Sequence, residues 1–375
     1  FGMAGIAIAL FALGMLCYLY SFDLQAARDQ IALTFGKKAQ SIIDANVAGQ
    51  GFSLSNATFT NAAGAAIKIA NGASINLTAT TFNQSGLIQI AGGTLTRTGG
   101  NLTNASGATL SGYGTINLGS FTLINNGAIS VGDAGASTLG LLSLTGNFSQ
   151  GASGTLSVDI GGPYRGLTYD ALDVMGTATL AGTLAVNHVN GFTAGAVEAF
   201  HLVRATTLSG TFATVTQPGP YTAVYGGANM VLGIGLTGIT EWNTNSSGNW
   251  GTAGNWTNGI PTATKVAIID RQSASPTITV DGTGGAASAA AVSSWEALTI
   301  TTAGNLTVAA PLTQTAATLS ITGGALTTGP AQVSTLNLTS GTWNANGPST
   351  VTTLTLSGGT LAGSGNVTVT GPFNV

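Results

Sequence analysis

The chain has 375 residues, of which 44% are hydrophobic and 6% are Asp, Glu, Lys or Arg, and its formal net charge is −3. An ordinary soluble domain has about 25% charged residues, so solubility must come from Thr, Ser, Asn and Gly, and the lack of a basic patch argues against nucleic acid as a partner. The single cysteine, Cys17, excludes an intrachain disulfide framework and a Cys-based zinc site.

Residues 1–22 carry no charge and are long enough to cross a bilayer as a helix. They predict a transmembrane or signal-anchor helix that gives the chain a membrane partner, and residues 23–50 predict a helical linker. A buried hairpin is the alternative for this segment. The chain begins with Phe and stops in the middle of a repeat, so we expect both ends to be cut. The residues expected to span the membrane are Phe1, Ile6, Leu10, Leu16 and Tyr20.

Residues 51–160 repeat apolar steps in period-2 runs, with glycine-containing turns between them. A unit of about twenty residues built from two or three short strands is typical of a parallel β-helix. Asparagines recur near the turns, where their side chains can satisfy backbone groups. Stacked on one another, they could form a ladder along the helix axis. They are Asn61, Asn83, Asn104, Asn125 and Asn126.

Three further segments follow. Residues 161–237 have longer alternation and more aromatic and charged residues, which predicts a β-rich capping module. Residues 238–297 predict a Trp-containing entry segment. Residues 298–375 predict short glycine-rich β-repeats, because residues 318–321 recur as 335–338 and 353–356, at spacings of 17 and 18 residues.

The fold class predicted by these patterns is all-β: a parallel β-helix or solenoid in two repeat blocks, preceded by an N-terminal hydrophobic helix. A repeat this short cannot bury its own apolar side and must stack on its neighbours. We therefore expect an elongated rod of stacked coils.

Several sequence motifs resemble those of exported β-helical proteins of Gram-negative bacteria, namely the autotransporter passengers and the filamentous-haemagglutinin-type adhesins. Residues 169–184 resemble the "YDxLxVxGxAxLxGxL" stretch of passenger modules, and residues 356–361 resemble their glycine-rich repeats. The resemblance implies a β-helical fold and a place at the cell surface or outside the cell, either membrane-anchored or exported. None of the 375 residues is expected to form the C-terminal translocator barrel of that family. Its first residues also resemble a type IV pilin, although Gly5 stands where that family has Glu.

Few residues suggest chemistry. His188 and His201 could act as bases, but ordinary loop or edge histidines are expected. Asp170 and Asp173 are three positions apart, so on a strand they would face opposite sides and share neither a metal nor a proton. Asp170 is expected to stabilise a turn. We predict no catalytic residue, no cofactor and no metal site.

Three tryptophans are candidates for a binding surface. Trp242, Trp250 and Trp256 could stack on sugars, or they could fill the core at a module junction, which we favour. The function expected from the sequence is a non-enzymatic adhesin or extracellular structural protein with host or matrix glycans or proteins as ligands. Two alternatives stay open: a polysaccharide-acting enzyme on a β-helix, and a pilin-like filament subunit with a β-helical outer domain.

Overall fold

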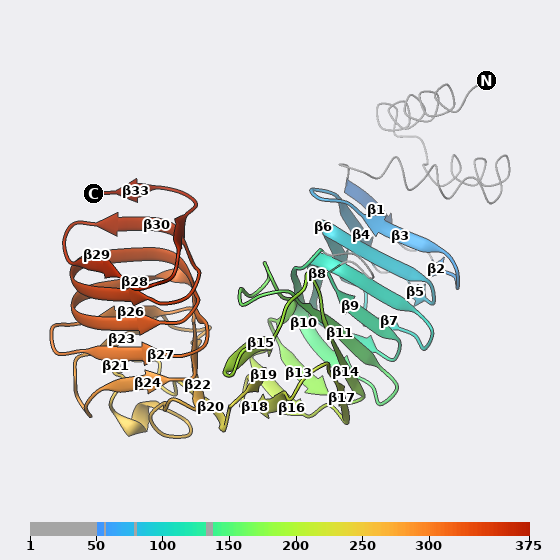
Figure 1. Cartoon of the computed structure of the whole chain (residues 1–375). Helices are drawn as coiled ribbons and strands as arrows, with labels where there is room; N and C mark the ends of the chain where they lie inside the picture. The colour runs from blue at the N-terminus through green and yellow to red at the C-terminus, as the bar shows by residue number, and fades with distance from the viewer. Residues whose placement is uncertain (1–50, 56–57, 79–80, 133–137) are drawn as a thin grey trace.

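The computed structural model describes residues 51–55, 58–78, 81–132 and 138–375 (Figure 1). Strands dominate these residues, and the helical structure among them is the short 3-10 turn η2 (Ala253–Asn255). No helix within these ranges is long and apolar enough to cross a membrane. The helices predicted for residues 1–22 and 23–50, with the proposed membrane-spanning side chains, lie outside the described residues.

Hydrogen bonds join the strands into two sets, one of 19 strands and one of 14. The first strand set is β1 (Gly51–Ser55), β2 (Thr58–Asn61), β3 (Ala66–Ile69), β4 (Ser74–Thr78), β5 (Thr81–Gln84), β6 (Leu87–Arg97), β7 (Leu102–Asn104), β8 (Thr109–Asn125), β9 (Ala128–Val131), β10 (Leu141–Gln150), β11 (Thr155–Ile160), β12 (Ala171–Val174), β13 (Thr177–Leu180), β14 (Thr183–His188), β15 (Glu198–Arg204), β16 (Thr207–Gly210), β17 (Thr214–Thr216), β18 (Thr222–Tyr225) and β19 (Asn229–Ile234). The second strand set is β20 (Gly238–Glu241), β21 (Gly248–Asn249), β22 (Lys265–Ile269), β23 (Thr277–Val280), β24 (Ala287–Ala289), β25 (Ala291–Ser294), β26 (Ala297–Ile300), β27 (Asn305–Val308), β28 (Leu312–Thr328), β29 (Ala331–Ala345), β30 (Ser349–Leu356), β31 (Thr360–Ala362), β32 (Val367–Val369) and β33 (Phe373–Asn374).

Parallel pairing of a strand with the one a coil later recurs through both sets, which confirms the predicted all-β parallel solenoid. In the second set Leu319 pairs with Leu336, and Leu336 pairs with Leu354. Equivalent leucines therefore lie directly above one another, and all three are at most 3% exposed. Burying one such side chain contributes about 1.5–3 kcal/mol, and it is the neighbouring coil that provides the burial.

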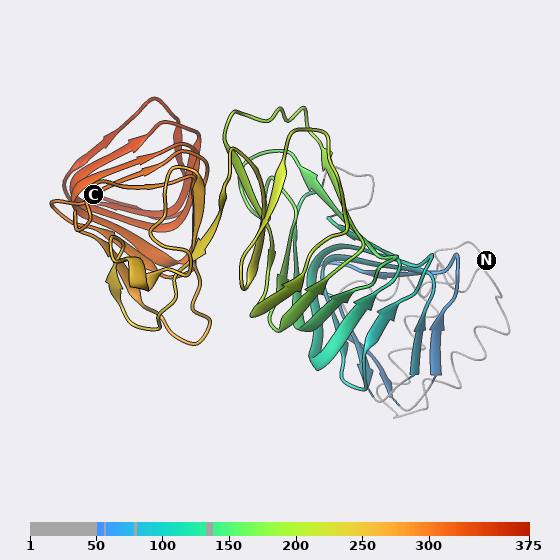
Figure 2. The same cartoon turned by 90° about the horizontal axis from the view of Figure 1, so that it is seen from below.

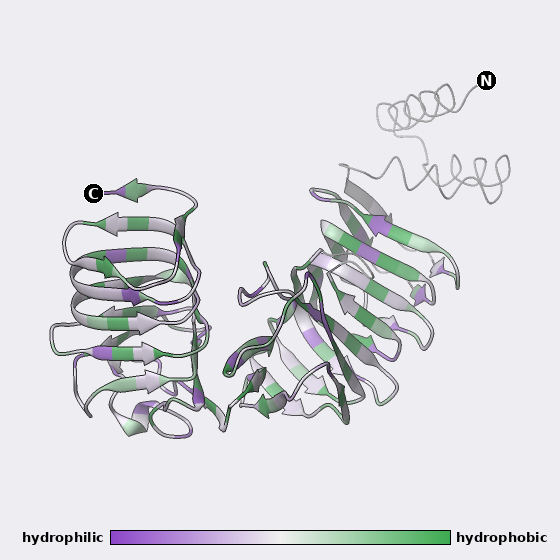
Figure 3. Ribbon diagram, in the orientation of Figure 1, coloured by the Kyte–Doolittle hydropathy of each residue, from purple (hydrophilic) through white to green (hydrophobic). Residues whose placement is uncertain are grey.

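Alternation along each strand decides which side chains form the core. In β11, Leu156, Val158 and Ile160 are at most 1% exposed, while the residues between them face outward. Figure 3 shows the same alternation as hydrophobic and hydrophilic bands across successive coils. The first and second sets enclose separate apolar cores, and a smaller apolar cluster joins them.

The coils are widest where the two sets meet. In the first set Ile75 pairs with Leu95, 20 positions later, whereas Leu172 pairs with Val203, 31 positions later. In the second set the spacing is 25 positions between β22 and β25 and falls to 18 between β29 and β30. Each stack therefore tapers away from the junction.

Antiparallel pairing between named strands appears at the end of the first set, within the described residues. β19 pairs antiparallel with both β15 and β18. Such a hairpin occupies strand edges that would otherwise be free to pair with another chain. It lies within the segment that the sequence predicts as a capping module.

The two stacks do not continue in one line, so the prediction of a single rod is wrong. After β19 the chain turns, and the second set runs back beside the first, as Figures 1 and 2 show. The Tyr164 hydroxyl donates a hydrogen bond of 2.5 Å to the Pro348 carbonyl oxygen, which links residues 184 positions apart. The bend depends on side chains at the junction, which the repeat pattern does not describe.

An amide ladder runs inside the first set. Asn61 Nδ2 donates to Gln84 Oε1 at 2.7 Å. Asn104 Nδ2 donates to Asn125 Oδ1, and Asn125 Nδ2 donates to Gln150 Oε1, both at 2.8 Å. All five side chains are at most 3% exposed, and each also donates to a backbone carbonyl. The ladder thus satisfies backbone groups where the coils turn.

Gly112 marks the closest approach between two coils of the first set. Its φ of 113° lies where only glycine is at ease. A Cβ added there would lie 1.8 Å from the Ile90 carbonyl oxygen. Glycine at this position lets β8 stack on β6 without displacing backbone.

Candidate functional site

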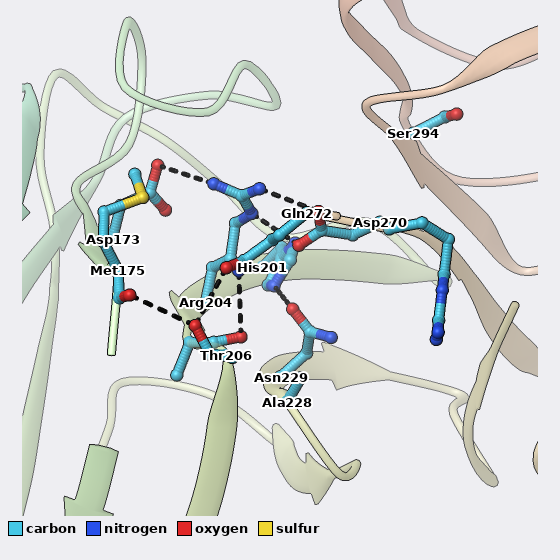
Figure 4. A network of polar contacts seen from close by, with 12 residues as sticks. Asp173, Met175, His201, Arg204, Thr206, Ala228, Asn229, Asp270, Gln272 and Ser294 are labelled. Carbon is cyan, nitrogen blue, oxygen red and sulfur yellow. Dashed lines mark hydrogen bonds and ion pairs between the residues drawn. The ribbon is translucent and has the colours of Figure 1, made fainter. Parts of the chain in front are cut away.

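The densest group of charged side chains lies where the two strand sets meet. We call Arg165, Asp173, Arg204, Asp270 and Trp295 the junction network (Figure 4 shows part of it). Asp173 lies in β12 and Arg204 in β15, whereas Asp270 follows β22 and Trp295 follows β25. The network therefore includes residues from both sets, in a chain with only 6% charged residues.

A bidentate ion pair forms the centre of the network. Arg204 Nε lies 2.6 Å from Asp270 Oδ2, and Arg204 Nη2 lies 2.7 Å from Asp270 Oδ1. Arg204 Nη1 lies 3.9 Å from Asp173 Oδ2. The side chains of Arg204, Asp270 and Asp173 are 9%, 5% and 8% exposed. Paired, hydrogen-bonded charges of this kind are tolerated in a protein interior, whereas a single unpaired charge there is strongly destabilising.

Arg165 closes the network on the side of the first set. Its Nη2 donates to Asp173 Oδ1 at 2.7 Å, and its Nε donates to the His201 carbonyl oxygen at 2.8 Å. Two guanidinium groups thus face two carboxylates, and their charges balance.

Trp295 packs against both arginines. The Arg204 guanidinium carbon lies 4.3 Å from the ring centroid, and that of Arg165 lies 5.8 Å from it. The His201 ring meets the same indole edge-on at 5.6 Å. A cation over an indole face contributes about 2 kcal/mol when desolvated. The aromatic ring therefore contributes to holding the arginines in place.

His201 is a buried neutral histidine. Burial, with the nearby Arg165 charge, holds its pKa well below the ordinary value of 6.5. Its Nε2 lies 2.8 Å from Asn229 Oδ1, so Nε2 carries the proton, and Nδ1 has no hydrogen-bond partner. Asn229 Nδ2 in turn donates to Glu241 Oε1 at 2.9 Å, which extends the polar contacts into β20.

This arrangement is that of a buried ion-pair network. The carboxylates of Asp173 and Asp270 are occupied by arginine, and the neighbouring His201 is 2% exposed. An acid or base in catalysis must reach the proton it transfers. Among the described residues no group of three or more His, Cys, Asp or Glu side chains could hold a metal ion.

The other residues that the sequence singled out lie apart from the network. His188 Nε2 lies 2.7 Å from the Tyr221 hydroxyl, and its ring meets Phe192 edge-on. Asp170 accepts hydrogen bonds from the backbone N–H groups of Gly140 at 2.7 Å and Asp159 at 2.9 Å. Burial raises the pKa of Asp170 to about 7.

The three tryptophans of the entry segment are packed inside it. Trp242, Trp250 and Trp256 are 1%, 1% and 3% exposed. Trp256 contacts both other rings edge-on, at 5.2 and 4.9 Å, and its Nε1 donates to the Trp250 carbonyl oxygen. None of the three rings presents a face to solvent in this arrangement. The structure therefore places the three tryptophans in the core, which is the alternative that the sequence favoured. Sugar stacking by these rings stays an untested prediction.

Outward-facing residues form uncharged rows across the coils, which we call the outer rows. In the first set, strand pairing aligns β13 with β16; in the second, it aligns β28, β29 and β30. The aligned positions hold Thr177 with Thr207, Thr179 with Ser209, Thr318 with Thr335 and Thr353, and Ser320 with Asn337 and Thr355. The sequence repeat already aligned the rows of the second set, whereas the rows of the first set followed only from the coil register.

Comparison with known protein families, with curated proteins and with solved structures finds no match for this chain.

Proposed function

We propose that this chain is an exported cell-surface adhesin or extracellular structural protein of a Gram-negative bacterium. The outer rows support this proposal. Thr, Ser and Asn repeat at equivalent positions in successive coils, about 4.8 Å apart. Such a face offers many similar polar contacts without charge, and many weak contacts on one molecule reinforce one another. Host or matrix glycans or proteins are the proposed ligands.

The finer architecture is part of the same proposal. Residues 51–160 and 298–375 would be the two repeat blocks, residues 161–237 a cap that ends the first block and residues 238–297 the entry segment of the second. The resemblance to passenger modules and haemagglutinin-type adhesins supports this division. Residues 1–22 would attach the protein to a membrane or direct its export.

The second candidate is a polysaccharide-acting enzyme, which is favoured only by the grouping of Asp, Arg and His at the junction. Their burial and mutual pairing argue against it. An enzyme would turn over a polysaccharide, and alanine substitution of His188, His201 or Asp170 would abolish that turnover. Such a result would replace the adhesin proposal. A fibre with a helical core, seen by electron microscopy, would favour the pilin-like alternative instead.

The direct test is adhesion of beads coated with the full chain to immobilised glycans and matrix proteins. Paired substitutions Thr177→Lys with Thr207→Glu, and Thr335→Lys with Thr353→Glu, place opposite charges opposite one another, so neither stack is strained by repulsion. We expect adhesion to fall at least several-fold because charged groups retain water on a face that bound through neutral contacts.

The matched control is Ser357→Lys with Ser364→Glu, which puts the same charges on exposed positions outside the outer rows. It should leave adhesion unchanged. The proposal would be refuted if the control lost as much adhesion as the variants with charges in the outer rows. It would also be refuted if the unaltered chain bound to none of the surfaces.

A further inference from the structure

Few side-chain contacts hold the two strand sets in their bent arrangement. The apolar cluster that joins the sets is small and includes four alanines, namely Ala199, Ala290, Ala291 and Ala310. The polar contacts across the junction include the Arg204–Asp270 pair and the hydrogen bond from Thr206 Oγ1 to Gln272 Oε1 at 2.8 Å. Much of the attachment between the sets is therefore ionic and polar.

Ionisable groups surround the central pair from every element packed on it. Each side of the junction contributes acids and bases, so the charge state of the whole group depends on pH. They are Arg165, Tyr169, Asp173 and His201 from the first set, and Glu241, Asp270, Arg271 and Glu296 from the second.

Acid removes the balance of this group. Protonation removes the charge of a carboxylate, and a neutral Asp173 or Asp270 would leave the guanidinium groups of Arg165 and Arg204 buried against Trp295 without counter-ions. Burial raises the pKa of Glu296, so this acid is neutralised early. Burial and the charges of Arg165 and Arg204 favour the neutral form of His201 by lowering its pKa. Removing one partner of a buried ion pair costs about 3–5 kcal/mol.

The stacks themselves have no such weakness. Their cores are apolar, and the amide ladder from Asn61 to Gln150 does not titrate in water. The buried Asp170 inside the first set is favoured in its neutral form, which acid supplies. Acid should therefore act on the junction before it acts on either stack.

We propose that the junction network is an acid-released latch, which holds the two strand sets bent against each other at neutral pH and lets them separate in acid while each stack stays folded. Release would expose Trp295 and the outward faces of β12 and β15. The surface available to a partner would thus change with pH without unfolding.

Small-angle X-ray scattering of the full chain, with far-UV circular dichroism on the same samples, tests this proposal. Between about pH 7 and pH 3, we expect the maximum dimension to increase while the β-sheet signal is retained. Asp270→Asn should give the larger dimension already at neutral pH. The matched control Asp281→Asn removes an exposed acid of the second set and should scatter as the unaltered chain does.

A third variant separates ionic release from general acid damage. Arg204→Met combined with Asp270→Leu replaces the ion pair by apolar side chains of similar size, and this kind of change is often neutral or stabilising. It should remain bent in acid. Scattering that does not change with pH, or a dimension that grows only together with loss of the β-sheet signal, would overturn the proposal. So would opening of the double variant in acid.

Discussion

Replacing Asn125 by leucine would remove the middle of the amide ladder. The substitution deletes hydrogen bonds to Gln150 Oε1 at 2.8 Å and to the Thr155 carbonyl oxygen at 3.1 Å, and the bond accepted from Asn104 Nδ2. Two buried acceptors lose their donor, and each costs about 1–3 kcal/mol. After a small gain from the apolar side chain, we expect the free energy of unfolding to fall by about 2–5 kcal/mol.

The assay is urea unfolding of the full chain, followed by circular dichroism and by tryptophan fluorescence. All five tryptophans lie between residues 242 and 343, so fluorescence reports on the second set and circular dichroism on both. The matched control is Asn83→Leu, since Asn83 is exposed and makes one hydrogen bond of 3.4 Å to Thr60 Oγ1. The reasoning would be refuted if Asn125→Leu shifted the dichroism midpoint no more than Asn83→Leu does.

Three further predictions concern single sites. The raised pKa of Asp170 makes the folded state bind more protons than the unfolded state between about pH 4 and 7, so the contribution of Asp170 to stability falls as pH rises. The unaltered chain should lose stability relative to Asp170→Asn over that same range, and an unchanged difference between the two unfolding midpoints would contradict this. Gly112→Ala should destabilise the first set by more than the roughly 1–2 kcal/mol of backbone strain, because the added Cβ also meets the Ile90 carbonyl oxygen. Gly64→Ala, with φ of 80° and open space around the glycine, should cost only that strain. Equal urea midpoints for the two variants would show that the contact with Ile90 has no energetic cost. Trp343→Ala should lower the free energy of unfolding of the second set by about 3–5 kcal/mol, because this side chain is fully buried and its Nε1 donates to Thr328 Oγ1; an unchanged fluorescence midpoint would oppose it.

The repeating pattern of apolar residues made the solenoid predictable from the sequence. The same pattern could have identified all members of the amide ladder, whereas the search for turn-forming residues found only part of them. Asparagines near turns suggested a ladder, which includes Asn61, Asn104 and Asn125 but neither Asn83 nor Asn126. Gln84 and Gln150 were missed because glutamine is not a turn residue. Each of the five ladder residues stands two positions after an apolar residue that lies in the core or packs against it: Phe59, Phe82, Leu102, Leu123 and Phe148. An amide at that offset in successive repeats was the available signal.

The junction network was not predictable in the same way. Arg204 and Asp270 are 66 positions apart and belong to different strand sets. Their meeting depends on the turn of the chain after β19, and no local pattern specifies its direction. Periodic contacts between adjacent coils follow from register, whereas contacts between the two stacks follow from tertiary packing.

The taper of the second stack affects how this protein could change in length. From β28 to β30 the spacing between paired residues is 17 to 19 positions, so an added segment of that size would find the same neighbours above and below. In the wide coils near the junction, an insertion of that size would be too short to go round once. Gain or loss of material by gene duplication should therefore be tolerated in residues 312–356 and selected against around residues 171–204.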